Sequence, residues 1–271
     1  MIRSSVTISL VPEARGGPFV FWDDLAAGCR EAKRLGFDAV EVFAPPTLDP
    51  TALRRALDDN GLKLAAMGTG AGWVLHRLTL TSPDADVRRR AADFIRAVID
   101  LAGPFGAPAI IGSMQGRHGD GVDETTALSY LAEALGPLAG HARQFRVPVL
   151  FEPLNRYETN LVNTAADGLW LRAKAGGENV KLLLDLFHMN IEEVDPPEDI
   201  RAASGAVGHV HFVDSNRRPA GCGHTDFGPI AAALHEIGYD GYVSAEALPY
   251  PNPVQAAVLT IEAYRKYFGG K

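Results

Sequence analysis

The sequence predicts an α/β protein that folds as one (β/α)8 barrel, or TIM barrel, and three observations support this fold. Short apolar segments alternate with amphipathic helical segments along the whole chain. Eight such pairs are present, which favours a closed barrel over an open doubly wound sheet. The chain has 271 residues, and such a barrel needs about 250. Because no composition break marks a linker, we expect residues 1–271 to form a single domain.

The expected strands are short segments rich in aliphatic and β-branched residues. In chain order they span residues 5–10, 39–43, 62–67, 108–112, 147–151, 181–185, 207–213 and 242–246. The expected helices carry apolar residues at helical spacing. They span residues 22–35, 51–60, 84–104, 123–145, 164–175, 198–203, 226–237 and 253–268.

Boundary residues support several of these helices. Asp49 and Pro50 stand where an N-cap and a first helical residue are expected before 51–60. Ser82 and Pro83 are expected to do the same for 84–104. Glycines follow three expected helices, as left-handed terminators do: Gly36, Gly61 and Gly238.

Composition and charge exclude several classes of function. The net charge is −7 and the arginines are scattered, so we expect no nucleic-acid partner. Cys29 and Cys222 show no disulfide-framework spacing, which fits a reducing compartment. No apolar run approaches the roughly 18 residues of a membrane helix, and the N-terminal apolar run 6–11 is too short for a signal peptide. We therefore expect a soluble cytoplasmic protein without a membrane partner.

Four residues that favour hard divalent metals each stand at the end of an expected strand: Glu152, Asp185, His211 and Glu246. They recur about every thirty residues, which is the length of one β/α repeat. A single strand-end carboxylate is more often solvated or a helix cap, but these four occupy equivalent positions on consecutive strands. Three oxygen donors and one imidazole predict an open Mn²⁺ or Mg²⁺ site rather than a closed zinc site.

Polar neighbours follow three of these residues closely. Glu158, His188 and Arg217 lie three to six residues beyond a candidate ligand. Together with a metal they suit a small, hydroxyl-rich substrate with a carbonyl group. The alternative for Arg217 is a solvated loop charge paired with Asp214. His209 shares a strand face with His211, and we expect it to be either a hydrogen-bonded core histidine or a residue that supports the ligand.

The candidate ligands lie in four distinctive segments: EPLNRYETN (152–160), DLFHMNIEE (185–193), HVHFVDSNR (209–217) and SAE (244–246). These segments resemble the D-tagatose 3-epimerase family of xylose isomerase-like barrels. Within that family, GCGHTDF (221–227) and LPYP (248–251) are most similar to the 5-keto-L-gluconate epimerase branch. The resemblance extends more weakly through the N-terminal half.

This resemblance implies one bound divalent metal ion, usually Mn²⁺, with Co²⁺ or Mg²⁺ as substitutes. It implies a small sugar or keto-sugar acid as the substrate and a homodimer or homotetramer as the assembly. It also assigns the metal ligands and the substrate contacts. The ligands would be Glu152, Asp185, His211 and Glu246, and the contacts would be Glu158, His188 and Arg217.

The chemistry of epimerisation supports a further division of roles. A proton next to a ketone is weakly acidic, so a metal must stabilise the enediolate that forms when the proton leaves. Inversion then needs one group to remove the proton and another to return it from the opposite face. We expect Glu152 and Glu246 to be this acid/base pair, with Asp185 and His211 only holding the ion. Glu158 is expected to orient His188 or a substrate hydroxyl.

Three other functions stay open on the sequence. An aldose-ketose isomerase, similar to hydroxypyruvate isomerase, needs the same metal and enediolate. A metal-dependent endonuclease would need more metal ligands and a basic surface, which the charge of −7 disfavours. A sugar-binding barrel without activity would have no use for two carboxylates in the metal shell.

The resemblance also implies what should line the sugar pocket. Ketohexose epimerases of the resembled family often line the far end of the pocket with aromatic residues. The comparable strand-end positions here carry Thr7, Ser113 and Leu248. This difference leaves a keto-aldonate open as the substrate, with Arg117 or Trp73 as candidate contacts.

Overall fold

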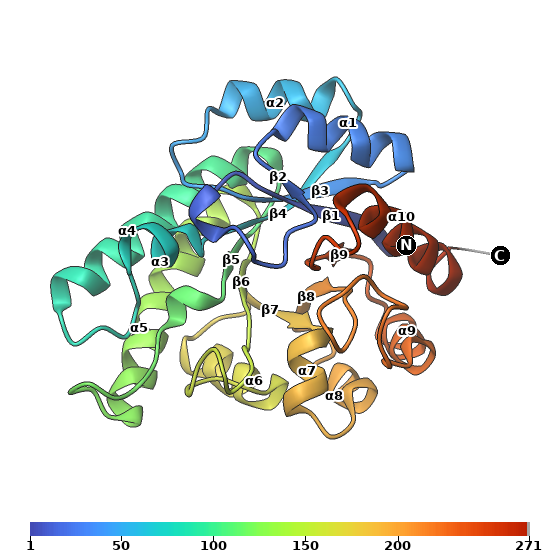
Figure 1. Cartoon of the computed structure of the whole chain (residues 1–271). Helices are drawn as coiled ribbons and strands as arrows, with labels where there is room; N and C mark the ends of the chain where they lie inside the picture. The colour runs from blue at the N-terminus through green and yellow to red at the C-terminus, as the bar shows by residue number, and fades with distance from the viewer. Residues whose placement is uncertain (270–271) are drawn as a thin grey trace.

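Eight parallel strands close into a barrel in the computed structural model, of which residues 1–269 are described (Figure 1). Each strand pairs with the next, and the last pairs with the first. The expected (β/α)8 barrel is therefore confirmed. The strands are β1 (Arg3–Ser9), β3 (Ala39–Phe43), β4 (Lys63–Gly68), β5 (Ala109–Ile111), β6 (Val149–Phe151), β7 (Val180–Asp185), β8 (Val207–His211) and β9 (Tyr242–Ala245).

One additional strand, β2 (Phe21–Trp22), pairs with the end of β1. The helix expected over 22–35 would have begun at Trp22. The first helix instead begins at Leu25, because the Asp24 side chain caps it by accepting a hydrogen bond from the Ala27 amide. A strand of two residues is too short to show the alternation of apolar and polar residues by which strands are predicted, so β2 was not expected.

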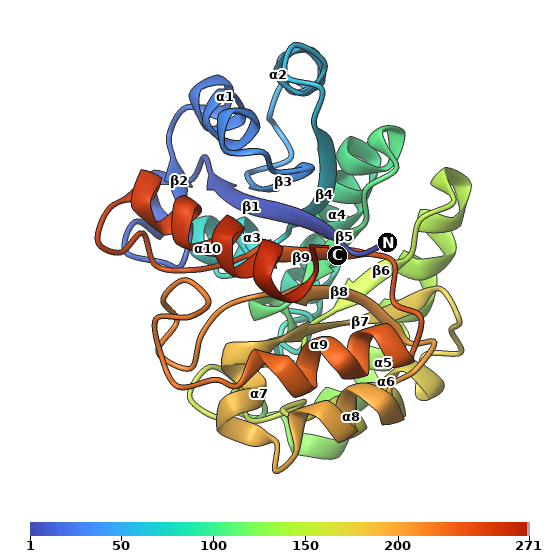
Figure 2. The same ribbon diagram turned by 90° about the vertical axis from the view of Figure 1, so that its right-hand side faces the viewer.

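Helices surround the barrel on its outer side (Figures 1 and 2). Eight of them match the expected helices to within a few residues: α1 (Leu25–Leu35), α2 (Pro50–Asp58), α4 (Ala85–Ala102), α5 (Glu124–Ala142), α6 (Ala165–Lys174), α8 (Pro196–Ala202), α9 (Phe227–Glu236) and α10 (Pro253–Tyr267). Within residues 1–269, no helix combines the length and the apolar character needed to cross a membrane.

Two further short helices lie in loops at the carboxyl ends of strands. They are α3 (Ala71–His76), which follows β4, and α7 (Leu186–Glu192), which follows β7. The sequence predicted loops here because six or seven residues, one of them glycine in the first case, show little helical periodicity. Four 3₁₀ turns, η1 (Pro12–Ala14), η2 (Gly103–Phe105), η3 (Ser113–Gln115) and η4 (Arg143–Phe145), complete the connections.

The helix boundaries follow the expected capping chemistry with one exception. Asp49 caps α2 by accepting a hydrogen bond from the Thr51 amide. Two expectations are wrong for α4: Ser82 is not its cap, and Pro83 is not its first residue. The helix begins at Ala85, because the carboxylate of Asp84 caps it by accepting a hydrogen bond from the Asp86 amide. The three expected glycine terminators have φ angles of 93°, 61° and 68° for Gly36, Gly61 and Gly238.

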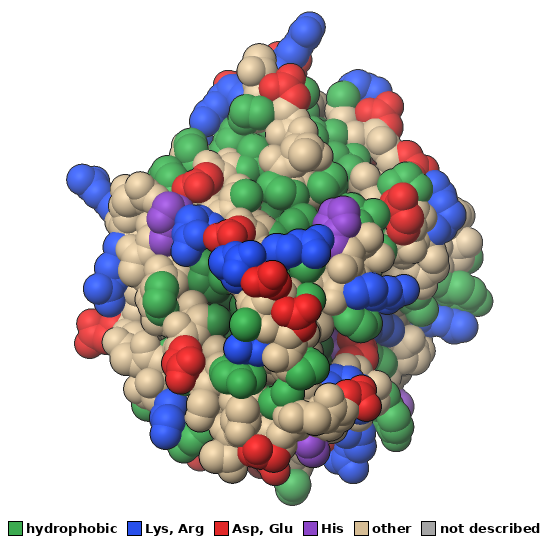
Figure 3. Space-filling view, turned by 90° about the vertical axis from the view of Figure 1, so that its left-hand side faces the viewer, with side chains coloured by type: hydrophobic (Ala, Val, Ile, Leu, Met, Phe, Trp, Pro, Cys, Tyr) green, Lys and Arg blue, Asp and Glu red, His purple; other side chains and the backbone are tan. Residues whose placement is uncertain are grey.

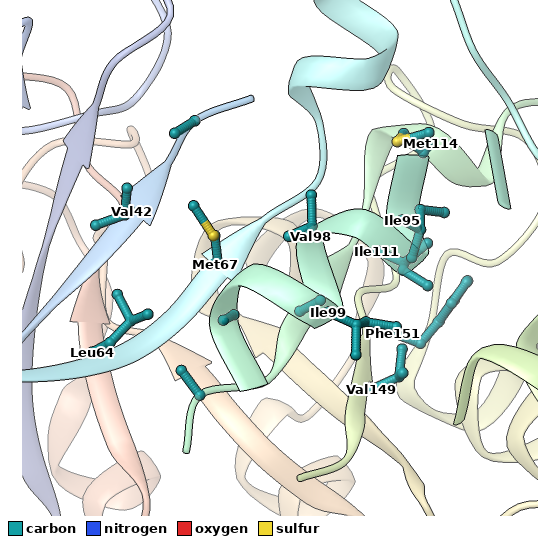
Figure 4. Packing of buried hydrophobic residues seen from close by; sticks show 14 of the residues in the cluster. Val42, Leu64, Met67, Ile95, Val98, Ile99, Ile111, Met114, Val149 and Phe151 are labelled. Carbon is teal, nitrogen blue, oxygen red and sulfur yellow. The ribbon is translucent and has the colours of Figure 1, made fainter. Parts of the chain in front are cut away.

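The core lies in two layers, one outside and one inside the strands. Outside, Ile95, Val98 and Ile99 of α4 face apolar side chains of β4 to β6 such as Met67 and Phe151 (Figure 4). Inside the barrel, a small cluster consists of Ala66, Ile110, Leu150 and Leu183. Side chains two residues further along a strand point to the same face. The inner layer therefore directs Glu152 and Asp185 toward the barrel axis at the strand ends.

Charged side chains of both signs are mixed on the side of the molecule that Figure 3 shows. On α4, for example, Arg89 pairs with Asp86 and Arg96 pairs with Asp93. The arginines of this helix are therefore interspersed with carboxylates and do not form a basic stripe.

Candidate metal centre and substrate cavity

The four candidate metal ligands meet at the carboxyl ends of β6 to β9. Glu152 and Glu246 directly follow β6 and β9, whereas Asp185 and His211 are the last residues of β7 and β8. One donor atom from each side chain lies within 4.8 Å of the other three. The structure therefore brings together the four residues that the spacing selected, and their role as ligands stays a proposal.

His211 stands at the centre of this group. Its Nδ1 lies 3.3 Å from Asp185 Oδ2, 3.4 Å from Glu152 Oε1 and 3.5 Å from Glu246 Oε2. Three carboxylate oxygens and one ring nitrogen thus face one another in the barrel mouth. This is a donor set that suits a hard divalent cation.

Burial supports the fit of a cation at this point. Glu152 and Asp185 are buried, and Glu152 Oε1 has no hydrogen-bond partner within residues 1–269. Glu246 is only partly exposed. Buried carboxylates are expensive unless a positive charge or a donor compensates them. A divalent cation in contact with these oxygens would supply that charge.

The pKa values show how strongly the carboxylates interact. Burial raises the pKa of Glu152 to about 8, although the nearby imidazole of His211 opposes the shift. Burial also raises the pKa of Glu246, against the opposing charges of His211 and Arg217. Burial would lower the pKa of His211, but the charges of Glu246 and Glu41 outweigh it and raise this pKa well above its usual value. Protons therefore compete with a metal ion for this site.

Glu41 on β3 supports the imidazole from behind, and the sequence analysis did not identify it. Its Oε1 accepts a hydrogen bond from His211 Nε2 at 3.2 Å, and its Oε2 accepts one from His209 Nε2 at 2.8 Å. All three side chains are buried. Burial opposes ionisation of Glu41, but the charge of His211 and hydrogen bonds from both histidines lower its pKa. The expected hydrogen-bonded role of His209 is therefore confirmed, with Glu41 as its partner.

The sequence does contain a signal for Glu41, because it is the one charged residue inside the apolar strand AVEVF (39–43). A carboxylate in a buried strand needs a partner, and the sequence offers no way to see that β3 and β8 face each other across the barrel.

His188 on α7 points its free ring nitrogen toward the same centre. Nε2 lies 3.7 Å from Asp185 Oδ2 and 3.9 Å from Glu152 Oε1, and it has no hydrogen-bond partner within the described part of the chain. Nδ1 accepts a hydrogen bond from Asn155 Nδ2 at 2.7 Å. Burial lowers the pKa of His188, against the charge of Asp185. A neutral ring with Nδ1 as acceptor carries its proton on Nε2, which faces the centre.

The expected contact between Glu158 and His188 is indirect. Glu158 Oε1 lies 4.0 Å from His188 Nδ1, and the side-chain amide of Asn155 stands between them. The same amide donates to Glu158 Oε1 at 3.1 Å and to the histidine. Asn155 therefore positions both side chains, and the sequence did not predict this role. Asn155 belongs to the segment 152–160, but the sequence of that segment does not show which side chains its amide contacts.

Arg217 reaches into the site, so the alternative of a solvated loop charge paired with Asp214 is wrong. Nη1 donates to Glu158 Oε1 and Nη2 to Glu246 Oε2, both at 2.9 Å. The guanidinium also lies over the ring of Phe187, 4.8 Å from its centroid. Asp214 instead accepts hydrogen bonds from backbone amides of its own loop.

A cavity of about 300 Å³ opens over this centre. Glu152, Glu158, Arg217 and Glu246 line it on one side. Aromatic side chains line it as well: Phe19, Phe43 and Trp73. These three aromatic side chains show that the difference at Thr7, Ser113 and Leu248 does not extend to the whole pocket. They come from the segment before β2, from the end of β3 and from α3, which the comparison of positions 7, 113 and 248 did not include.

Comparisons with known proteins agree with this fold. A family model described as a xylose isomerase-like TIM barrel matches residues 29–267. The chain is 35% identical over 227 residues to L-ribulose 3-epimerase from Mesorhizobium japonicum, which covers 82% of this chain and 73% of the relative. It is 30% identical over 266 residues to D-psicose 3-epimerase from Agrobacterium fabrum, covering 95% and 87%. A solved structure of L-ribulose 3-epimerase superimposes with a TM-score of 0.83 at 27% identity, covering 99% of this chain and 95% of that one.

Proposed function

The chain belongs to the xylose isomerase-like TIM barrel family, and we propose that it is a metal-dependent epimerase. It would invert the carbon next to the ketone of a ketose or keto-sugar acid. Two relatives named as ketose 3-epimerases support this reaction class. The observation that carries the proposal is the convergence of three carboxylates and one imidazole beneath a sugar-sized cavity. The finer similarity to the 5-keto-L-gluconate epimerase branch stays a prediction.

We propose that Glu152, Asp185, His211 and Glu246 hold one divalent ion. The oxygen-rich donor set favours Mn²⁺, with Co²⁺ or Mg²⁺ as substitutes. Once bound, the ion would supply Lewis-acid stabilisation of the negative charge that develops on the substrate oxygen during proton removal. Asp185 would hold the ion without transferring a proton. Its side chain is fully buried, and its Oδ1 accepts a hydrogen bond from the Phe187 amide.

Glu152 and Glu246 are the proposed acid/base pair. They follow β6 and β9, which are not neighbours in the barrel, and both line the 300 Å³ cavity. They can therefore approach a bound sugar from different sides, as inversion requires. One would remove the proton next to the ketone, and the other would return a proton to the opposite face.

Three further side chains are proposed to hold the sugar. Arg217 and Glu158 line the cavity and are already oriented by their mutual ion pair. His188 presents its free Nε2 toward the centre and can donate to a substrate oxygen near the reacting carbon. These contacts would fix the sugar before proton transfer, which lowers the entropic part of the barrier.

The decisive experiment measures proton exchange and turnover on a panel of ketoses and keto-sugar acids in D₂O with Mn²⁺. Glu152→Gln and Glu246→Gln are each expected to lower kcat by about 10²–10⁴-fold, because each removes one proton-transferring group. Incorporation of solvent deuterium at the inverted carbon should fall in parallel. Glu262→Gln, at an exposed glutamate of α10, is the matched control. Unchanged exchange and turnover in both variants would refute this assignment.

The same samples separate the proposal from its alternatives. Chelation should abolish turnover and added Mn²⁺ should restore it, whereas activity that survives chelation removes the metal from the proposal. NMR of the products distinguishes an epimerised ketose from the aldose that an isomerase would release. Tight sugar binding without any turnover under Mn²⁺ would favour a binding protein.

A further inference from the structure

A second cavity, of about 460 Å³, adjoins the candidate substrate cavity. Both cavities are lined by Trp73, Ser113, Leu154 and Glu158. Of these two cavities, only the smaller is lined by the candidate ligands Glu152 and Glu246. The larger cavity therefore lies further from the metal centre, and a molecule bound at the centre can extend into it.

The far wall of this cavity is held by hydrogen bonds between separate loops. The Thr81 hydroxyl donates to the carbonyl oxygen of Gln115 at 2.9 Å, and the Thr159 hydroxyl donates to that of Gly116 at 2.8 Å. Asn160 pairs with the backbone of His118 in both directions, at 3.0 and 3.1 Å. A wall fixed in this way is ordered before a ligand arrives, which reduces the entropy lost on binding.

The lining combines an aromatic ring with hydrogen-bonding groups. Trp73 is 37% exposed and lies where the two cavities meet. Thr79, Arg117 and His118 line the far part. The imidazole of His118 makes no hydrogen bond to protein groups among residues 1–269. Such a surface suits a sugar ring, whose C–H face packs on an aromatic ring while its hydroxyls form hydrogen bonds.

The charges in the lining favour a neutral ligand. Arg117 is the one Lys or Arg among the lining residues, and Asp120 and Glu158 line the same cavity. Glu158 is already paired with Arg217. Arg117 makes no ion pair among residues 1–269, but the two carboxylates of the lining repel a carboxylate or phosphate group. A neutral polyhydroxyl group meets no such repulsion.

We infer that the larger cavity is a second sugar subsite, and that the preferred substrate is a ketose with a neutral glycosyl group at the end remote from the ketone. This inference rests on the proposed function, because the metal centre must hold the ketone end. It extends that function by naming a substrate larger than a monosaccharide.

The experiment compares kcat/KM of the Mn²⁺-loaded protein for isomaltulose, which carries a glucosyl group on O6 of fructose, with that for fructose. The expected kcat/KM is at least tenfold higher for isomaltulose. His118→Ala and Thr79→Trp should each lower the ratio at least fivefold, because one removes a contact and the other fills the cavity. His224→Ala, at an exposed histidine outside both cavities, is the matched control and should keep the ratio.

Each other outcome has a distinct meaning. Fructose turnover with equal or lower kcat/KM for isomaltulose would overturn the subsite and leave the proposed function intact. A higher kcat/KM for fructose 6-phosphate than for isomaltulose would show an anion site and also overturn it. If neither sugar is turned over, calorimetry decides. Tighter binding of isomaltulose than of fructose, lost in His118→Ala, would support the subsite and show that the proposed epimerase does not act on these two sugars, whereas equal binding would refute the subsite.

Discussion

The two ring nitrogens of His211 face different partners: Nε2 faces Glu41, and Nδ1 faces the carboxylates of the candidate centre. The raised pKa of His211 favours a ring that carries a proton on each nitrogen. If a metal ion displaced the proton on Nδ1, Nε2 would keep its proton and donate to Glu41 Oε1, and the lone pair of Nδ1 would face the carboxylates of the candidate centre. A carboxylate behind a histidine ligand fixes the tautomer and raises the basicity of the ligating nitrogen. Glu41 is therefore positioned to strengthen metal binding without touching the ion.

Substitution of Glu41 tests this role. Glu41→Gln is expected to raise the Kd for Mn²⁺ by about 10–100-fold, because a neutral amide holds the imidazole less firmly and polarises it less. Isothermal titration calorimetry measures the Kd, and Glu262→Gln provides the exposed glutamate control. A Kd equal to that of the unmodified protein would show that Glu41 serves only the packing of the barrel.

Proton competition at the same centre gives metal binding a pH dependence. The pKa of Glu152 is raised to about 8 by burial, so below this pH the carboxyl holds a proton that the ion must displace. Affinity for Mn²⁺ should therefore fall as the pH drops from 8 to 6, by up to about tenfold per pH unit for each displaced proton. Calorimetry in buffers with different ionisation enthalpies measures the released protons. The same Kd at pH 6 and pH 8 would contradict the expectation.

Convergence of the ligands also depends on the size of the residues that follow the neighbouring strands. Glu152 follows β6, and its carboxylate packs directly over Gly112, which follows β5. A Cβ atom at Gly112 would lie 2.4 Å from Glu152 Oε2, closer than real atoms approach. The absence of a side chain on one strand end therefore makes room for the candidate ligand on the next.

Gly112→Ala is expected to push the Glu152 carboxylate away from the centre and to raise the Kd for Mn²⁺ at least about tenfold. Gly140→Ala is the matched control. Gly140 lies exposed on α5, and a Cβ there meets no atom within 4 Å. That substitution should leave metal binding unchanged and stabilise the protein by up to about 1 kcal/mol. Equal metal affinities for the two variants would show that Glu152 adapts to the added methyl group.

The closed barrel joins the ends of the chain through direct contacts. β9 pairs with β1, and the Tyr264 hydroxyl on α10 donates to the carbonyl oxygen of Ile2. The candidate ligands come from the last four strands, so the metal centre depends on the closure. We propose that residues 1–271 form one domain whose folding and metal binding are coupled.

Thermal unfolding tests this coupling on the whole molecule. Mn²⁺ at 100 times its Kd should stabilise the folded protein by about 2.7 kcal/mol, because the ion binds the assembled site and not the unfolded chain. The Tm should rise with Mn²⁺ concentration, and circular dichroism and tryptophan fluorescence should report one coincident transition. Two separate transitions would contradict a single domain, and a Tm independent of Mn²⁺ would contradict the metal site.

Much of the architecture was accessible from local patterns. The alternation of apolar segments and amphipathic helices predicted eight strands and eight of the helices, and the strand ends selected the four residues that converge. The short elements β2, α3 and α7 were missed, because packing rather than local periodicity determines them. Ser82 is a residue type that often caps helices, but the carboxylate of Asp84 accepts the hydrogen bond at the start of α4.

The sequence by itself determined the fold class and the donor types, because strand alternation and the identity of strand-end side chains are local properties. Only the tertiary structure decided which side chains contact one another across the barrel. It placed Glu41 behind His211, Asn155 between Glu158 and His188, and Arg217 on Glu158 and Glu246. It also showed a second cavity beside the first. These contacts join residues distant in the chain, and closure of the barrel is what brings them within hydrogen-bonding distance.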